Sequence, residues 1–240
     1  MANQLDSKIV VALDYADEEL ALDFTRRVSP LLCKLKIGKE LFTRAGPQLV
    51  RRLVDQGFDV FLDLKFHDIP ATVAGAIAAS ADLGVWMVNV HCLGGSRMLE
   101  AARSSLDRHG GPTLLTGVTV LTSMQKEDLI ELGIDQSPQD LVFRLASLAA
   151  TSGLDGIVCS GQEAGAIKQH FGNAFLRITP GIRPASYGSS DDQRRILTPG
   201  EALAGGSSYL VVGRPVTGAR DPAESLLAIK KEIGEDSDRD

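Results

Sequence analysis

The stretch DVFLDLKFHDIPATVAGAIAASADLG, residues 59–84, decides the fold that the sequence predicts. It opens with a short apolar run of the kind found in buried strands and continues into alanine-rich sequence with helical spacing. Pro70 suits the first turn of a helix, where its missing N–H is not needed. A strand that leads directly into a helix is the repeating unit of parallel sheets.

Three charges interrupt this strand pattern, and they are Asp63, Lys65 and Asp68. Strict alternation places Asp63 and Lys65 on one face and the neighbouring leucines on the other, so both charges would point into the mouth of a barrel. Burying charge is costly unless the charges pair, and paired buried charges often mark chemistry. Two structural readings stay open, namely an ion pair at Asp63–Lys65 and a carboxylate at a helix N-terminus for Asp68.

The strand–helix unit repeats along the chain. Apolar runs that predict strands cover 8–14, 31–38, 59–65, 85–91, 114–122, 155–160, 176–181 and 209–215, and each is followed by helical spacing. Eight such units predict one (β/α)8 (TIM) barrel domain over residues 1–240, with a polar tail from about residue 234. A doubly wound open sheet is the alternative, but the first strand ends in LDYAD instead of a glycine-rich phosphate loop.

Composition narrows the class of protein further. The net charge of −6 argues against general nucleic-acid binding. Three scattered cysteines without a CxxC pair argue against a zinc site and predict a reducing compartment. The chain shows no signal-peptide pattern and no apolar run near the ~18 residues of a membrane span, so we expect a cytoplasmic protein with no membrane partner.

Polar residues gather where the predicted strands end, which is the functional face of such barrels. Asp14 ends the first strand and Lys36 the second. Lys34 shares the parity of Lys36, so alternation does not separate them, and we choose Lys36 because it lies nearer the strand end. The structural alternatives are a helix-capping turn for Asp14 and a solvated loop lysine for Lys36.

The end of the chain carries a different signal. In barrels, the loops after strands seven and eight often bind phosphate through backbone N–H groups. Gly213 allows close backbone approach, and Arg214 can grip phosphate oxygens. Arg183 is a further candidate or a plain surface arginine. The polar segment 185–195 predicts a mobile lid from which Gln193 could reach a ligand, or else an ordinary flexible loop.

Taken in order, the motifs ALDY, KIG, LDLKFHDIP, TVLTS, TPGIRP, DQRR and VGRP resemble the orotidine 5′-phosphate decarboxylase family. The resemblance runs from about Lys8 to Pro222. It implies conversion of orotidine 5′-monophosphate to UMP and CO₂ in pyrimidine synthesis, without a metal or organic cofactor. It also implies a homodimer of (β/α)8 barrels with sites at the interface, to which Asp68 and Thr72 reach from the partner.

The resemblance assigns a role to each matching residue. Lys65 would donate the proton, and Asp63 would flank the reacting carboxylate. The remaining residues would bind substrate: Asp14 and Lys36 at the ribose, Thr122 near the pyrimidine, Pro180 lining the site, and Arg183, Gln193, Gly213 and Arg214 at the phosphate.

Two other functions remain open on the sequence. The first is a magnesium-dependent sugar-phosphate decarboxylase or aldolase on the same scaffold, in which the carboxylates would hold a metal that stabilises an enediolate. The second is a non-catalytic nucleotide- or phosphate-binding barrel, which would have no use for the cluster of charges around Lys65.

Overall fold

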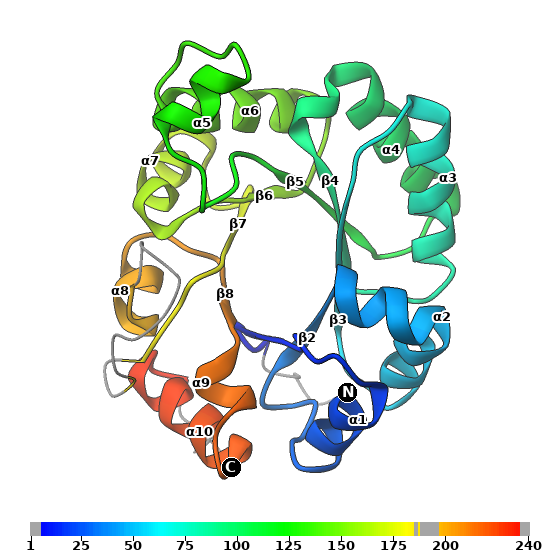
Figure 1. Cartoon of the computed structure of the whole chain (residues 1–240), viewed down its shortest axis with the longest axis vertical. Helices are drawn as coiled ribbons and strands as arrows, with labels where there is room; N and C mark the ends of the chain where they lie inside the picture. The colour runs from blue at the N-terminus through cyan, green and yellow to red at the C-terminus, as the bar shows by residue number, and fades with distance from the viewer. Residues whose placement is uncertain (1–5, 185–186, 188–196, 236–240) are drawn as a thin grey trace.

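The computed structural model describes residues 6–184, 187 and 197–235, and it confirms the predicted closed barrel (Figure 1). Neighbouring strands are parallel and follow chain order, and the last strand pairs with the first. The strands are β1 (Ile9–Ala12), β2 (Lys34–Gly38), β3 (Val60–Phe66), β4 (Met87–His91), β5 (Leu114–Val118), β6 (Gly156–Val158), β7 (Leu176–Thr179) and β8 (Tyr209–Val212).

Helices surround this ring of strands, as Figure 1 shows. They are α1 (Glu18–Arg26), α2 (Lys39–Asp55), α3 (Pro70–Ala81), α4 (Ser96–His109), α5 (Lys126–Glu131), α6 (Pro138–Thr151), α7 (Gly161–Phe171), α8 (Pro199–Ala204), α9 (Arg214–Thr217) and α10 (Pro222–Glu232), with a short 3₁₀ turn η1 (Cys92–Gly94) after β4. Helix α2 is kinked at Gly46, where φ is 70° and the next residue is Pro47. The kink follows because proline removes a helical hydrogen bond and clashes with the preceding turn.

Alternation along the strands divides the apolar side chains between two cores. On β1, Ile9 and Val11 pack outward against the helices, whereas Val10 and Ala12 point into the barrel. Inside the barrel they meet Phe61 and side chains from β4, β7 and β8. The barrel interior is therefore a packed core, and a ligand can enter only at the ends of the strands.

The end of the barrel where the strands begin is closed by a cluster that we call the N-terminal plug, defined as Asp6, Lys34, Asp59, Trp86 and Tyr209. The Lys34 ammonium lies 2.9 Å from Asp6 and 2.6 Å from Asp59. It also lies 4.6 Å from the centre of the Trp86 ring, and the Tyr209 hydroxyl donates to Asp6 at 2.8 Å. Lys34, Asp6, Asp59 and the Tyr209 hydroxyl all have polar partners within the plug, which makes it a structural closure.

Most of the strands are shorter than the sequence predicts, and two of these differences bear on the site. The fifth strand ends at Val118 and not at 122, and a helix that was not predicted, α5, follows because Gln125 and Asp128 form a capping box. The eighth strand ends at Val212, since Arg214 already begins α9.

No helix in the described part of the chain is long and apolar enough to cross a bilayer.

The three cysteines are buried thiols without disulfide partners. Cys33 precedes β2, Cys92 follows β4 and Cys159 follows β6. Burial raises the pKa of Cys33 and of Cys92 to about 12, with nearby lysines opposing the shift at Cys33, and burial shifts the pKa of Cys159 the same way. These thiols are therefore protonated and shielded in the folded protein.

Candidate active site

Four charged side chains form an alternating row across the ends of β1, β2 and β3. The Lys36 ammonium lies 3.2 Å from an oxygen of Asp14 and 3.3 Å from an oxygen of Asp63. The other oxygen of Asp63 lies 2.6 Å from the Lys65 ammonium. The structure thus brings together four of the residues predicted from the sequence, and it places Lys36, not Lys34, at this end of the barrel.

Asp63 is the buried centre of the row, with a relative exposure of 9%. Burial acts to raise the pKa of its carboxyl group, but the charges of Lys36 and Lys65 and hydrogen bonds from Lys65 and Asn89 outweigh it and leave the pKa lowered. Asp63 is therefore an anion at neutral pH, held between two ammonium groups.

The predicted division of faces is confirmed, because Leu62, Leu64 and Phe66 share one side of β3 and Lys65 contacts Asp63, but the backbone at Lys65 is irregular. Lys65 has a φ of 53°, which makes it the one non-glycine residue with positive φ in the part of the chain that the structure describes. The ladder between β3 and β4 also shifts register between Leu62 and Phe66. A bulge of this kind re-aims a side chain, and backbone strain of this kind tends to collect at functional sites.

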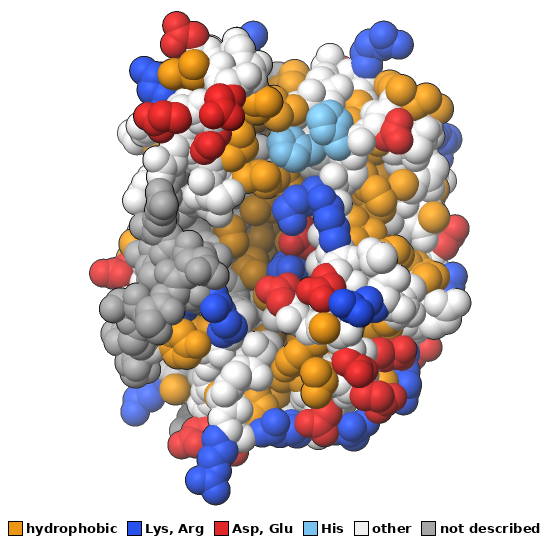
Figure 2. Space-filling view, viewed as in Figure 1, with side chains coloured by type: hydrophobic (Ala, Val, Ile, Leu, Met, Phe, Trp, Pro, Cys, Tyr) orange, Lys and Arg blue, Asp and Glu red, His pale blue; other side chains and the backbone are white. Residues whose placement is uncertain are grey.

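A cavity of ≈ 350 Å³ opens beside the row of charges. Seven of the predicted residues line it, namely Asp14, Lys36, Asp63, Pro180, Arg183, Gly213 and Arg214, together with Ala12, Gly181, Val211 and Thr217. Figure 2 looks into this end of the barrel, where acidic and basic side chains stand side by side around a hollow with apolar walls. The cavity therefore has carboxylates and ammonium groups on one side and two arginines on the other.

The other predicted residues are not among those that line the cavity, and of these Lys65 lies beside it through its contact with Asp63. Asp68, Thr72 and Thr122 are exposed and do not line this cavity. Asp68 accepts a hydrogen bond from the backbone N–H of Ile69 at 2.6 Å, and no ion pair of Asp68 occurs within the described ranges. Gln193 falls outside the residues that the structure describes. Within the described ranges, no hydrogen bond or ion pair joins Asp68 to Lys65 of the same chain.

Histidines and metal-binding groups add little to the site. His91 stacks on His67, with ring centres 5.5 Å apart, and its Nδ1 accepts from the Leu93 N–H. Burial, then His67 and two nearby lysines, lower the pKa of His91 to about 4, so it is a neutral packed residue at pH 7. Over the described ranges, no three His, Cys, Asp or Glu residues are grouped so as to hold a metal ion.

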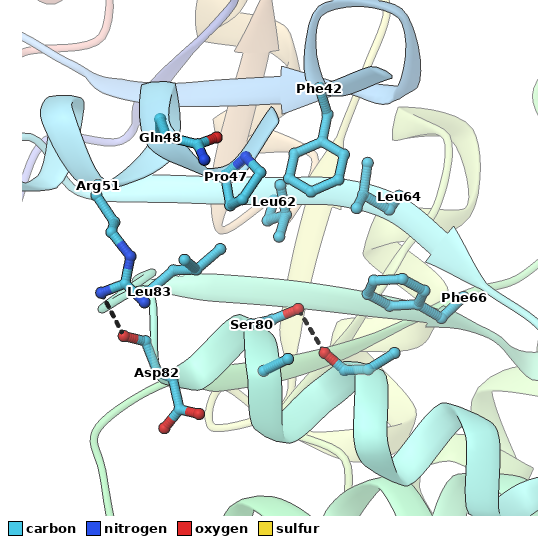
Figure 3. Close-up of a pocket in the computed structure, with 12 residues that line it drawn as sticks. Phe42, Pro47, Gln48, Arg51, Leu62, Leu64, Phe66, Ser80, Asp82 and Leu83 are labelled. Atoms are coloured by element: carbon cyan, nitrogen blue, oxygen red, sulfur yellow. Dashed lines mark hydrogen bonds between the residues drawn. The ribbon is translucent and has the colours of Figure 1, made fainter. Parts of the chain in front are cut away.

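A second pocket, of ≈ 580 Å³, lies behind β3 and is largely apolar. Figure 3 shows Leu62, Leu64 and Phe66 of β3 facing Phe42 and Pro47 of the kinked helix α2 across it. These side chains point away from the face that carries Asp63. The pocket therefore backs the functional strand without belonging to the active site.

Sequence reasoning missed Asn89, which is fully buried on β4 and contacts both Asp63 and the backbone of Lys65. A signal was present, because Asn89 is the one polar residue inside the apolar run VWMVNV. A buried polar side chain requires hydrogen-bond partners, and its place near a strand end would have put those partners at the site.

The fold and the site together define a (β/α)8-barrel protein whose polar site lies at the carboxyl ends of its strands. The family model described as "Orotidine 5′-phosphate decarboxylase / HUMPS family" matches residues 7–229. The chain belongs to this family.

Relatives and solved structures agree with this membership. The chain is 56% identical to orotidine 5′-phosphate decarboxylase of Chromohalobacter salexigens, over 99% of this chain and 100% of that protein. It is 57% identical to the protein of the same name from Nitrosococcus oceani, over 95% of this chain and 97% of that protein. The crystal structure of orotidine 5′-phosphate decarboxylase from Lactobacillus acidophilus superposes with a TM-score of 0.85 at 39% identity, over 95% of this chain and 99% of that one.

Proposed function

We propose that this protein decarboxylates orotidine 5′-monophosphate to UMP and CO₂, with Lys65 as the proton donor. The observation that carries the proposal is the 2.6 Å contact between the Lys65 ammonium and Asp63, at the edge of a cavity with arginines on its other side. The names of relatives at more than half identity support the same activity. They do not favour the alternative, a magnesium-dependent sugar-phosphate decarboxylase or aldolase.

The chemistry needs a fixed cation beside the carbon that loses its carboxyl group. When the bond from C6 to the carboxylate breaks, its electron pair stays on C6 in the plane of the ring, without an adjacent carbonyl to accept it. An ammonium already placed there stabilises that charge without reorganisation. Lys65 then transfers a proton from Nζ to C6, which gives UMP and a neutral amine that solvent reprotonates.

The rest of the cavity would hold the nucleotide. Asp14 and Lys36, 3.2 Å apart, would bind ribose hydroxyls, and Arg183 and Arg214 would bind the phosphate, with Gly213 and Pro180 beside it. Gln193 would reach the phosphate, and Thr122 would lie near the pyrimidine. Binding energy from the phosphate, far from C6, can lower the barrier if it orders the site around the reacting carbon.

A homodimer is part of the proposal. Asp68 and Thr72 are exposed at the start of α3, on the face where the cavity opens, and each would complete the site of the partner chain. We also propose that the enzyme needs no metal or organic cofactor and works in the cytoplasm, where buried reduced thiols such as these are stable.

The activity is tested by following the loss of orotate absorbance when excess purified enzyme is mixed with orotidine 5′-monophosphate, before and after exhaustive EDTA treatment. We expect UMP to form at the same rate in both samples. No turnover would contradict the decarboxylase proposal, and activity that EDTA abolishes and Mg²⁺ restores would favour the metal-dependent alternative.

The shared site is tested by coexpressing two inactive variants, Lys65→Ala and Asp68→Ala, with different affinity tags. In a hybrid dimer, one site carries both defects and the other carries neither. Random pairing makes half of the dimers hybrid, so the mixture should regain about a quarter of wild-type activity. A mixture as inactive as its components would show that Asp68 does not act across an interface.

A further inference from the structure

Asn89 occupies the position where the ladder between β3 and β4 is broken. Leu62 pairs with Val88 and Phe66 with Val90, so the three residues 63–65 of β3 face the single residue Asn89 of β4. Regular backbone pairing cannot satisfy three residues with one. The unpaired stretch contains Asp63 and Lys65, so the bulge coincides with the candidate catalytic pair.

The side chain of Asn89 supplies hydrogen bonds in place of those that the ladder lacks. Its Oδ1 accepts from the backbone N–H of Lys65 at 2.7 Å, and its Nδ2 donates to Oδ1 of Asp63 at 2.7 Å. That same Asp63 oxygen accepts from the Lys65 ammonium at 2.6 Å. One amide therefore bridges the backbone of Lys65 and the carboxylate that its own side chain contacts.

An amide suits this position because it carries an acceptor and a donor on one rigid plane. Asn89 is 0% exposed and its own backbone stays in the ladder with Thr116, so the amide is held on a fixed strand. Lys65 has a positive φ, a conformation that a lysine adopts only when its surroundings impose it. The hydrogen bond from the Lys65 N–H to Asn89 acts directly on the backbone that has this conformation.

We propose that Asn89 is a positioning residue for the decarboxylation. Its amide holds Asp63 and the left-handed backbone of Lys65 together, and so aims the Lys65 ammonium at the carbon that loses CO₂. The inference rests on the proposed function for its catalytic consequence, whereas the positioning itself is a property of the fold. Asn89 does not line the cavity, so it acts through the two residues that it holds.

Removing both hydrogen bonds should slow chemistry without weakening ligand binding. Asn89→Leu keeps the size of the side chain and loses both contacts, and we expect kcat to fall about 10²-fold because a small misplacement of a reacting group has such an effect. The affinity for UMP, measured by calorimetry, should change less than about threefold, since that ligand is held through the ribose and phosphate. Thr113→Val is the matched control: it removes a buried 2.8 Å hydrogen bond to the Val85 carbonyl, and it should leave kcat unchanged.

Asn89→Asp separates the positioning from simple loss of packing. A protonated carboxyl group offers one carbonyl acceptor and one O–H donor, as the amide does, whereas the ionised form places an anion against Asp63. The charges that the structure puts around this point are Asp63 and Lys65 from β3 and Lys36 from β2, and His91 further along β4 is neutral. The kcat of Asn89→Asp, divided by that of wild type, should therefore rise as the pH is lowered from 8 to 5.

Three results would overturn the inference. One is an Asn89→Leu enzyme with kcat within about threefold of wild type. Another is a fall in kcat that Thr113→Val matches, which would mean general destabilisation. The third is a crystal structure of Asn89→Leu in which Lys65 keeps its positive φ and its contact with Asp63. If wild type fails to decarboxylate orotidine 5′-monophosphate, the proposed function fails, and this crystal structure alone still decides the positioning.

Discussion

Lys34 and Lys36 lie two residues apart on β2 and are both buried, yet they belong to opposite ends of the barrel. Lys34 sits in the N-terminal plug, between two carboxylates and against aromatic rings. Lys36 also sits between two carboxylates, Asp14 and Asp63, but these line an open cavity.

The difference shows what separates a structural ion pair from a functional one on the same strand. In the plug, Trp86 and Tyr209 cover the Lys34 ammonium, so its charge interacts with the groups that close the barrel. At the other end, Asp63 is shared between Lys36 and Lys65, and the cavity leaves room for a substrate to complete the set. Burial and pairing alone therefore do not mark a charged residue as functional. Contact with an open cavity separates Lys36 from Lys34.

The strongest test of the comparison removes the ammonium next to the cavity. Lys65→Ala should lower kcat by roughly 10⁴-fold or more, because it removes both the charge that stabilises C6 and the proton that C6 receives. Steady-state assays measure the loss, and circular dichroism should show an unchanged fold. Near-normal activity in this variant would remove Lys65 from the mechanism.

A sharper test makes the same substitution at both ends of β2. Lys34→Met should keep kcat/KM and lose about 1–2 kcal/mol of unfolding free energy, because its aspartate partners are half-exposed and screened. In a protein of this size the melting temperature would fall by roughly 2–8 °C. Lys36→Met should instead lower kcat/KM by about 10²-fold, with a smaller change in melting temperature. Equal activity losses in the two variants would contradict the assignment of a structural role to Lys34 and a functional role to Lys36.

The smallest expected effect is a pH dependence of stability in the plug. Burial acts to raise the pKa of Asp6, but hydrogen bonds from Lys8, Lys34 and Tyr209 outweigh it and lower that pKa from 3.8 to about 2. A lowered carboxyl pKa contributes stability above the unfolded value, and this contribution is lost as the pH falls from about 4 towards 2.

Urea unfolding at a series of pH values measures this contribution. At pH 6, Asp6→Asn should be less stable than wild type by about 1 kcal/mol, a figure reduced because Asp6 is half-exposed. The gap should close as the pH approaches 2. Asp135→Asn, at an exposed loop position, is the control and should show no such convergence. A gap that keeps its full pH 6 size down to pH 2 would mean that Asp6 stabilises the plug by packing.

The barrel could be predicted because each strand–helix unit has its own local pattern, and eight units leave few topologies. Seven predicted residues line one cavity because the carboxyl ends of parallel strands meet at one face. The position of a residue at the end of a strand was therefore enough to predict that it lies at the site. Where two candidates shared a face, as Lys34 and Lys36 do, the pattern could not decide, since alternation is blind to which end of the barrel a residue occupies.

Other features depend on contacts between segments distant in the chain. At the bulge, the N–H of Lys65 donates to Asn89, 24 residues away, and no local pattern in β3 predicts a positive φ there. Thr122 was placed at a strand end, but the strand stops at Val118 and Thr122 lies in an exposed loop. The role of Asp68 cannot be read from a single chain, because the site that it is proposed to complete belongs to a second copy.

The buried thiols give the protein natural reporters of how it comes apart. Cys33 lies at the end of the barrel closed by the plug, whereas Cys92 and Cys159 lie at the end that carries the cavity. Because a shielded, protonated thiol reacts only when its surroundings open, alkylation followed by mass spectrometry would time the exposure of each end separately. No label would have to be introduced, and the order of modification would tell whether the mouth loosens before the base.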